Sequence, residues 1–481
     1  MEIEKLADLA LMHARSIGAA YADVRFESSY GESVAAEDVK PKEAGRHSSA
    51  GFGIRALAGG SWGFCATNGD ETIERDDLLR AVSDAVSSAK ASARHSPPLS
   101  LPPAAHGGKY ETKVRRDALK IPPKERMALC VDASKEMAAK GIVKNNSTIG
   151  TVKANKFFFS SEGSRIRQEL TYTFAACFAV ARKGGVTDFY YGAEGGQAGF
   201  EAVSGAKRGG KNLFDVAGET KKNALALAGA KSARGPFETP VILDPDMLGL
   251  VVHEICGHPC EADRVLGWEA AWAGTSWWAD KVGQKIGSGC VNIVSDASVR
   301  GCLGSFGFDD EGIPAQRIVH MKGGVLNDFL HSRETAATMG KRPNGAMRAT
   351  SHHFAPTIRM TNTYMEGGGW KRDEIIEDTK RGVYLCGGHT PSIDSKRHNF
   401  QISCKIAYEI IGGEIGRPLR GVSLNGTADR FWSSVDAVAD DVEMRPVPNC
   451  GKGEPMQTCM VGNGGPHARA RAGIAGLAGG K

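Results

Sequence analysis

The stretch HEICGHPCEAD, residues 253–263, holds a His-Glu pair followed five positions later by a second histidine. A hydrolytic zinc site needs protein ligands, an open position for water, and a carboxylate that takes the proton of that water. His253 and Glu254 would supply one ligand and such a base from neighbouring positions, and His258 a second ligand. The stretch therefore predicts a zinc-dependent hydrolytic site.

The spacing of the two histidines is unusual. In the common HExxH pattern they lie four residues apart, on one face of a helix. Residues five apart on a regular α-helix point about 140° away from each other. Gly257 weakens a helix, while Pro259 disfavours the α conformation of His258 and removes a helical hydrogen bond. We expect the helix to end or bulge at Gly257, so that His258 turns back toward His253.

Two other interpretations of this stretch stay open on the residues alone. One is a closed structural zinc site, with the ligands His253, Cys256, His258 and Cys260. It leaves Glu254 without a role and crowds four ligands into eight residues. The other is a core helix without metal, in which two histidines and a glutamate would be costly to bury beside the apolar residues 248–252.

Composition excludes several classes of protein. With 41% hydrophobic and 24% charged residues, the 481-residue chain fits a globular protein of two or three domains. The net charge of +5 comes without a dense basic block, so nucleic acid is not the expected partner. The sequence has no run of 18 apolar residues, so no membrane span is predicted. The absence of an export signal and the unpaired spacing of the 11 cysteines indicate a cytoplasmic protein with reduced thiols.

The pattern of predicted elements changes near residue 232. Residues 1–232 mix amphipathic helices, expected at 74–92 and 122–140, with a strand-like hairpin at 51–68. Residues 233–481 consist mostly of short strand-like runs. We therefore predict an α+β fold of two domains. An N-terminal mixed α/β domain would contact substrate and partner, and a C-terminal, mostly antiparallel β domain would carry the motif helix.

Several segments, taken in order, resemble the TldD branch of the TldD/PmbA peptidases. Residues 253–263 resemble the family's HExxxHxxExD signature. The further matches are DDEGIP at 309–314 with Gln316-Arg317, RMTNTYM at 359–365, and NCGKG at 449–453, which resemble its DDEGTPxQR, RMTNTY and CGK elements. The resemblance is specific over residues 240–466. It is looser at 51–68, which resembles the family's GxGxR…GFxxTN hairpin.

This resemblance implies a zinc-dependent peptidase. In that family the two motif histidines and the cysteine of the CGK element bind zinc, and the motif glutamate is catalytic. Carried over, His253, His258 and Cys450 become the ligands and Glu254 the general base, with Cys459 and Cys256 as weaker candidates for the third ligand. The family cleaves peptides and unfolded chains.

The resemblance also implies a partner. TldD-type chains commonly assemble with a PmbA-type chain, so we expect a heterodimer, with a homodimer as the alternative. Because the PmbA branch lacks a complete metal motif, the competing function is a non-catalytic modulator or binding subunit with a structural zinc site.

Supporting roles are predicted for a few more residues. We expect Asp263 to orient a ligand histidine. A substrate could add as a strand to residues 359–365. The residues predicted to contact it are Arg359, Thr361, Asn362 and Thr363. The roles of Cys256, Cys260, His389 and His398 stay open.

Overall fold

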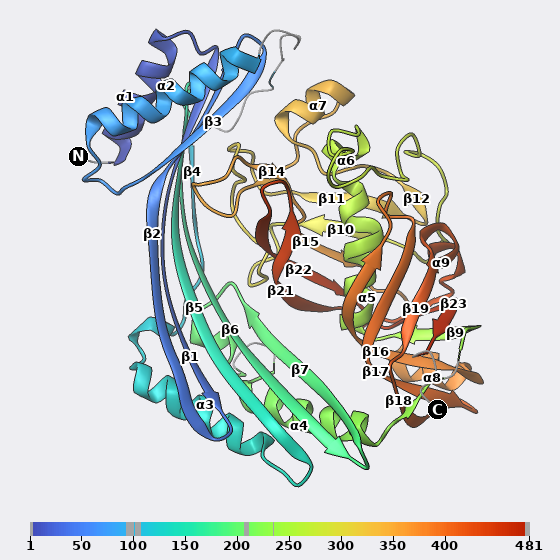
Figure 1. Ribbon diagram of the computed structural model, residues 1–481. Helices are drawn as coiled ribbons and strands as arrows, with labels where there is room; N and C mark the ends of the chain where they lie inside the picture. The colour runs from blue at the N-terminus through green and yellow to red at the C-terminus, as the bar shows by residue number, and fades with distance from the viewer. Residues whose placement is uncertain (1–2, 93–100, 102–106, 206–210, 234, 477–481) are drawn as a thin grey trace.

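Within the described residues, three large sheets build the fold. The computed structural model describes residues 3–92, 101, 107–205, 211–233 and 235–476. Figure 1 shows a long, curved N-terminal sheet standing beside a β-rich half that holds the other two sheets. The predicted mixed α and β class, with the motif helix in the β-rich half, is confirmed.

The N-terminal sheet has the strand order β3-β2-β1-β5-β6-β4, and β7 also pairs with β6. Its strands are β1 (Tyr21–Glu37), β2 (Lys40–Ala58), β3 (Ser61–Asn68), β4 (Gly107–Glu111), β5 (Ile142–Ser160), β6 (Arg165–Lys183) and β7 (Val186–Gly196). The predicted hairpin at 51–68 is confirmed as β2–β3. It turns at Gly59 and Gly60, whose φ angles of 61° and 82° suit glycine.

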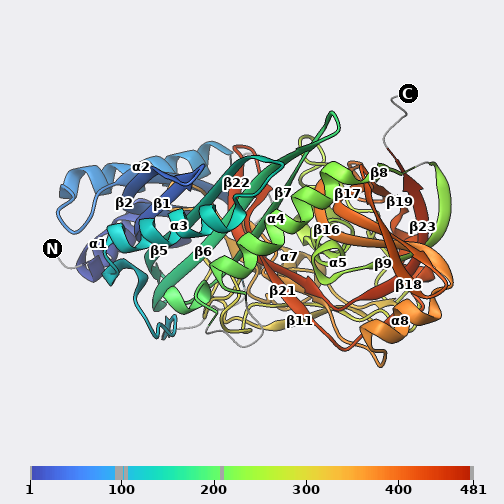
Figure 2. The same ribbon diagram turned by 90° about the horizontal axis from the view of Figure 1, so that it is seen from below.

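Helices pack on this sheet in two pairs. They are α1 (Ile3–Ser16), α2 (Arg75–Ser92), α3 (Pro123–Met137) and α4 (Leu213–Gly229). Leu6 of α1, Val82 of α2 and Phe52 of β2 are buried in one hydrophobic core. α3 and α4 form a second core at the other end of the sheet, where Figure 2 shows α4 lying between β7 and the β-rich half. Among the described helices, none combines the length and apolar character of a membrane span.

The sheet that we call the open sheet has the order β12-β11-β10-β15-β22-β21. Its strands are β10 (Ile293–Asp296), β11 (Arg317–Lys322), β12 (Val325–Leu326), β15 (Asn362–Met365), β21 (Glu443–Lys452) and β22 (Gln457–Gly465). β21 stands at one end of this order. β15 lies inside it, antiparallel to β10 and parallel to β22.

The sheet that we call the ring sheet has the order β16-β9-β23-β19-β17-β18-β8, and β20 pairs with β23. A further pairing of β16 with β17 closes part of it into a ring. Its strands are β8 (Lys231–Ser232), β9 (Phe237–Leu243), β16 (Arg381–Ile393), β17 (Asn399–Ile411), β18 (Glu414–Arg420), β19 (Ser423–Thr427), β20 (Ala437–Val438) and β23 (Ala468–Ala475).

Helix α5 (Pro245–Val252) packs between the ring sheet and the open sheet (Figure 1). Asp244 fixes where it begins, because its side chain accepts a hydrogen bond from the N–H of Met247, and Pro245 suits the first turn. Leu248 and Val251 are fully buried in the core of this half. The remaining short α-helices and β-strands are α6 (Ala262–Val265), α7 (Arg333–Met339), α8 (Arg372–Asp378), α9 (Ala428–Ser434), β13 (Met347–Arg348) and β14 (Thr357–Ile358).

Candidate metal centre

The motif stretch continues α5 as a π-helical turn. Residues His253–Gly257 form this turn, and a 3-10 turn follows at His258–Cys260. The N–H of His258 donates to the carbonyl of His253, five residues back. Because a π turn closes its hydrogen bond over five residues, residues five apart lie on one side of it. The expected bulge is confirmed, with the widening spread over His253–Gly257 rather than located at Gly257.

Gly257 is needed for this turn to fit. A Cβ atom at this position would lie 2.0 Å from the sulfur of Met360, which is itself fully buried. The turn therefore packs directly on the chain that leads into β15. A side chain at residue 257 would push the motif away from it.

The π turn brings both imidazoles beside Cys450 of β21. The ring centroids of His253 and His258 are 4.8 Å apart, and the Sγ of Cys450 lies 3.7 Å from the Nε2 of His258. One donor atom from each of the three buried residues lies within 4.8 Å of the others. Zinc bonds of about 2.0–2.1 Å to nitrogen and 2.3 Å to sulfur place tetrahedral ligand atoms about 3.5 Å apart, close to the 3.7 Å between the Sγ of Cys450 and the Nε2 of His258. A register shift in β21 between Val447 and Cys450 accompanies the cysteine's placement.

The second nitrogen of each imidazole has an oxygen partner. The Nδ1 of His253 lies 2.9 Å from the Oδ1 of Asn463, and the Nδ1 of His258 lies 3.1 Å from the Oε2 of Glu261. Such acceptors hold the proton on Nδ1 and leave Nε2 free to bind a metal. The residues present therefore fit a metal ion. The sequence assigned the orienting role to Asp263, but the contact to His258 is made by Glu261.

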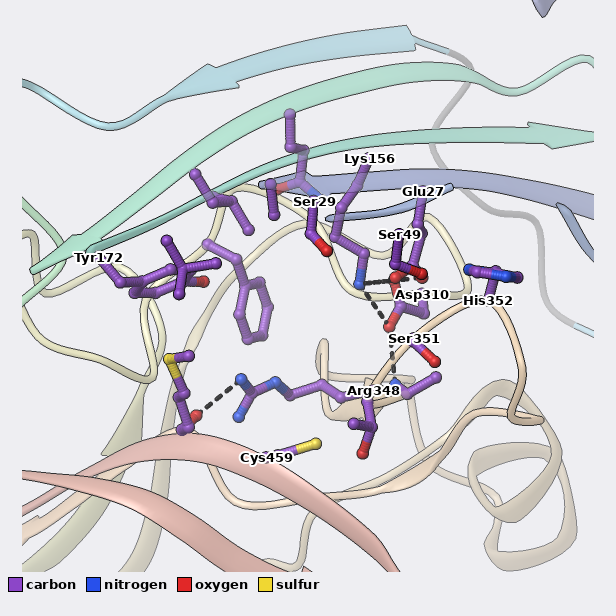
Figure 3. A pocket seen from close by; sticks show the side chains of 18 of the residues that line it. Glu27, Ser29, Ser49, Lys156, Tyr172, Asp310, Arg348, Ser351, His352 and Cys459 are labelled. Atoms are coloured by element: carbon purple, nitrogen blue, oxygen red, sulfur yellow. Dashed lines mark hydrogen bonds and ion pairs between the residues drawn. The ribbon is translucent and has the colours of Figure 1, made fainter. Parts of the chain in front are cut away.

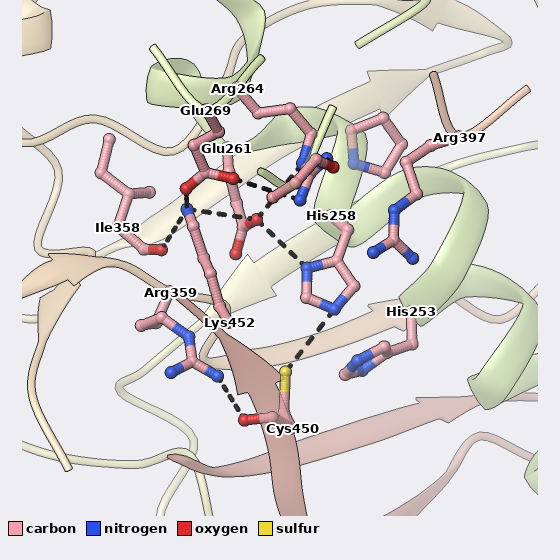
Figure 4. A network of polar contacts seen from close by, with 12 residues as sticks. His253, His258, Glu261, Arg264, Glu269, Ile358, Arg359, Arg397, Cys450 and Lys452 are labelled. Carbon is pink, nitrogen blue, oxygen red and sulfur yellow. Dashed lines mark hydrogen bonds and ion pairs between the residues drawn. The ribbon is translucent and has the colours of Figure 1, made fainter. Parts of the chain in front are cut away.

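A buried ion network stands behind His258 (Figure 4). Lys452 follows Cys450 by two residues on β21, and its Nζ lies 2.9 Å from the oxygens of Asp263, 2.9 Å from Glu269 and 3.3 Å from Glu261. Burial opposes the charge of Lys452, but these carboxylates raise its pKa above the usual range. The ammonium group thus holds in place the carboxylate that orients His258.

The three predicted ligands also influence one another's charge. Burial alone would raise the pKa of the Cys450 thiol, but the imidazoles of His253 and His258 hold that pKa well below its usual range. Burial lowers the pKa of His258 well below its usual range. For His253 burial acts in the same direction, yet the charge of Cys450 raises its pKa to about 9. The cysteine is thus held as a thiolate, the form that binds metal.

These residues open onto a cavity of about 720 Å³ between the N-terminal sheet and the β-rich half. Tyr190 and Tyr191 of β7 line one side, and residues 445–451 of β21 line another. Glu254 lies in the wall beside His253 and is 8% exposed. Its Oε2 accepts a hydrogen bond of 2.6 Å from the Nη1 of Arg397, a residue that the sequence did not single out.

The predicted substrate strand lies in the interior. The side chains of Arg359, Thr361, Asn362 and Thr363 are buried. Because β15 pairs with β10 on one edge and β22 on the other, no peptide can add to it. The prediction of strand addition at this segment is wrong. Arg359 instead donates to the carbonyl of Cys450, and Asn362 donates to the carbonyl of Asp296 at 2.8 Å.

The residues left open by the sequence have separate environments. Cys256 and Cys260 are buried, and the metal-binding group found among the described residues includes neither. His389 lines the cavity with its ring 5.8 Å from that of Tyr191. The Nε2 of His398 lies 2.9 Å from Asp429, outside the cavity wall.

The segment that resembles DDEGTPxQR lies at a second cavity of about 290 Å³ (Figure 3). There the Nζ of Lys156, from the N-terminal sheet, lies 2.6 Å from the Oδ1 of Asp310. Arg55 of β2 pairs with Glu311 at 2.9 Å. Arg348 donates to the carbonyl of Met460 across the same cavity. The two ion pairs join the N-terminal sheet to the β-rich half through buried charges.

Comparison with known proteins places the chain in a family. Models of the PmbA/TldA metallopeptidase family match it at residues 22–89 (domain 1), 116–228 (central domain) and 236–475 (C-terminal domain). A metalloprotease of Methanocaldococcus jannaschii is 32% identical over 449 residues, which cover 92% of this chain and 94% of that protein. A protein of Saccharolobus solfataricus named zinc metalloprotease TldD homolog is 27% identical over 469 residues, covering 95% and 97%.

Solved structures show the same fold. TldE from Thermococcus kodakarensis superposes with a TM-score of 0.76 at 16% identity, over 98% of this chain and all of that one. A protein of Thermotoga maritima described as a putative modulator of a DNA gyrase gives a TM-score of 0.79 at 19% identity, over 98% and 100%. The chain belongs to the TldD/PmbA metallopeptidase family.

Proposed function

We propose that this metallopeptidase uses zinc held by His253, His258 and Cys450, with Glu254 as the general base. The observation that carries the proposal is the convergence of three donor atoms within 4.8 Å in the wall of a cavity that Glu254 also lines. Two imidazoles and a thiolate suit zinc, and one relative is named a zinc metalloprotease. Bound zinc would acidify a water molecule and polarise a peptide carbonyl. Glu254 accepts the water's proton and passes it to the leaving amine.

The proposed substrate is a peptide or an unfolded chain. The cavity runs along residues 445–451 of β21, which ends the strand order of the open sheet. An extended peptide can lie beside such a strand through main-chain hydrogen bonds, which favours broad specificity. This location replaces the interior strand β15.

The proposed partner is a PmbA-type chain in a heterodimer, with a homodimer as the alternative. The proposal is supported by the family and by the likeness to TldE. Light scattering of the chain alone and mixed with a PmbA-type chain distinguishes the two, because the heterodimer forms in the mixture and the homodimer without it.

Metal analysis combined with digestion of a peptide library tests the function. Glu254→Gln should keep about one zinc per chain and lose cleavage, and Cys450→Ala should lose the metal. Glu43→Gln, on the exposed part of β2, is the matched control and should keep both the zinc and the cleavage of peptides. Full activity of Glu254→Gln would rule out the glutamate base. Zinc binding without cleavage of any peptide, by the unmodified chain alone and mixed with a PmbA-type chain, would support the competing role of a modulator subunit.

A further inference from the structure

Arg397 directs its guanidinium group into the metal cavity from the turn between β16 and β17. Its Nη1 lies 2.6 Å from the Oε2 of Glu254, and its side chain is 21% exposed. Figure 4 shows the group pointing toward the imidazoles of His253 and His258. A cation from a distant segment thus stands one hydrogen bond from the proposed base.

The backbone of this turn adopts an uncommon conformation. Arg397 has a φ of 62°, in the left-handed region that few residues other than glycine adopt. Its N–H donates to the carbonyl of Asp394 at 3.0 Å. The carboxylate of Asp394 accepts from the N–H groups of His398 and Asn399 at 2.8 and 3.1 Å. Residues in such conformations gather at functional sites, where the surroundings hold them.

Neighbouring segments hold the turn on both sides of Arg397. The N–H of Trp277 donates to the carbonyl of Lys396 at 2.9 Å, and the N–H of Thr275 donates to that of Ser395 at 3.0 Å. His398 packs its ring 4.8 Å from that of Trp277 and pairs with Asp429. These contacts give His398 a role in fixing the turn.

The position of Arg397 relative to Glu254 determines what it can reach. A general base must lie within hydrogen-bond distance of the water it activates, and that water must lie about 3 Å from the carbonyl carbon it attacks. The carbonyl oxygen therefore comes within a few ångströms of a guanidinium group already bonded to the base. A guanidinium has five N–H donors, of which the contact to Glu254 uses one.

We propose that Arg397 is a catalytic residue that donates a hydrogen bond to the carbonyl oxygen of the peptide bond being cleaved. This inference rests on the proposed function. Glu254 takes a proton from water while the water oxygen bonds to the carbonyl carbon, and the π electron pair of the carbonyl moves onto its oxygen, where Arg397 stabilises the negative charge. When that pair returns, the C–N bond breaks and the amine leaves with the proton from Glu254.

Binding of a phosphinic peptide, whose tetrahedral phosphinate resembles the attacked carbonyl, tests this role by calorimetry on the zinc-loaded protein. Arg397→Ala should weaken that binding by about 100-fold, the usual effect of losing one oxyanion donor. Binding of the matching substrate peptide, measured in the Glu254→Gln background, should change by less than about threefold. Arg397→Lys should bind the phosphinate with intermediate affinity, which separates a lost contact from a misfolded chain.

A second background separates contact with the substrate from support of Glu254. In Glu254→Gln, the further change Arg397→Ala should still weaken phosphinate binding; if it has no effect there, Arg397 serves Glu254 alone and the proposal fails. If Arg397→Ala weakens the binding of the phosphinate and of the substrate peptide equally, the proposal also fails. Lys396→Ala, which removes an exposed cation from the same turn, is the control and should bind the phosphinate as tightly as the unmodified chain does. An unmodified, zinc-loaded chain that binds no phosphinate would overturn the proposed function itself.

Discussion

The Oε2 of Glu261 lies 3.1 Å from the Nδ1 of His258, three residues away across a 3-10 turn. Carboxylates in this position fix the ring and strengthen it as a ligand. Glu261→Gln should therefore weaken zinc binding by about 10- to 100-fold. Titration against a competing chelator measures the change. Zinc affinity equal to that of the unmodified chain would show that the contact does not matter for the metal.

Lys452→Met tests the ion network behind that contact. The substitution removes the cation that Glu261, Asp263 and Glu269 share, and leaves these carboxylates buried near one another. Breaking a buried ion pair costs about 3–5 kcal/mol, so the free energy of unfolding should fall by about that amount. Urea unfolding measures it. Lys322→Met, at an exposed position of β11, is the control and should change stability little.

Gly257→Ala should distort the π turn, because the new methyl group would overlap the sulfur of Met360. Overpacking of this kind costs about 1–3 kcal/mol. We expect fewer zinc ions per chain and a lower melting temperature. The double variant Gly257→Ala/Met360→Ala makes room for the methyl group and should regain zinc. If the double variant binds no more zinc than Gly257→Ala, the clash is not the cause.

The buried imidazole of His320 should make the stability of the protein depend on pH. It is buried on β11, and burial lowers its pKa from 6.5 to about 4, although Asp328 opposes the shift while His331 adds to it. The unfolded chain therefore takes up a proton near pH 6.5 that the folded chain resists until about pH 4. The contribution of His320 to the free energy of unfolding is fully present above pH 6.5. It is lost as the pH falls to about 4, a change of about 3 kcal/mol.

The measurement for His320 is urea unfolding at pH 7, 5 and 4 in the unmodified chain and in His320→Gln. The variant lacks the titrating ring, so its stability should fall less steeply over this range. Parallel curves for the two proteins would assign the pH dependence to other groups.

Local chemistry in the sequence predicted the motif turn, but not everything around it. Gly257 and Pro259 indicated a departure from the α-helix because their effects are local. Glu261 rather than Asp263 contacts His258 because of a 3-10 turn, which the spacing of the residues alone did not predict. Arg397 reaches Glu254 across 143 residues, from a turn whose conformation depends on tertiary contacts.

The sequence also did not predict whether a strand lies at the edge of its sheet or inside it. Residues 359–365 have the pattern of a strand, and the pattern is the same for an edge strand and an interior one. β15 is interior because β22, about a hundred residues later, pairs with it in parallel. Long-range pairing of this kind decides which strand ends the open sheet beside the cavity, and here that strand is β21.

The separation of His258 from Cys450 along the chain, 192 residues, has a consequence for synthesis. At about 5–20 residues per second, a ribosome needs roughly 10 to 40 s to make the segment between them. During that interval the nascent chain carries both motif histidines without the thiolate. Under the proposed function, a protease for unfolded polypeptides would thus be inert while it is itself an unfolded polypeptide beside the ribosome.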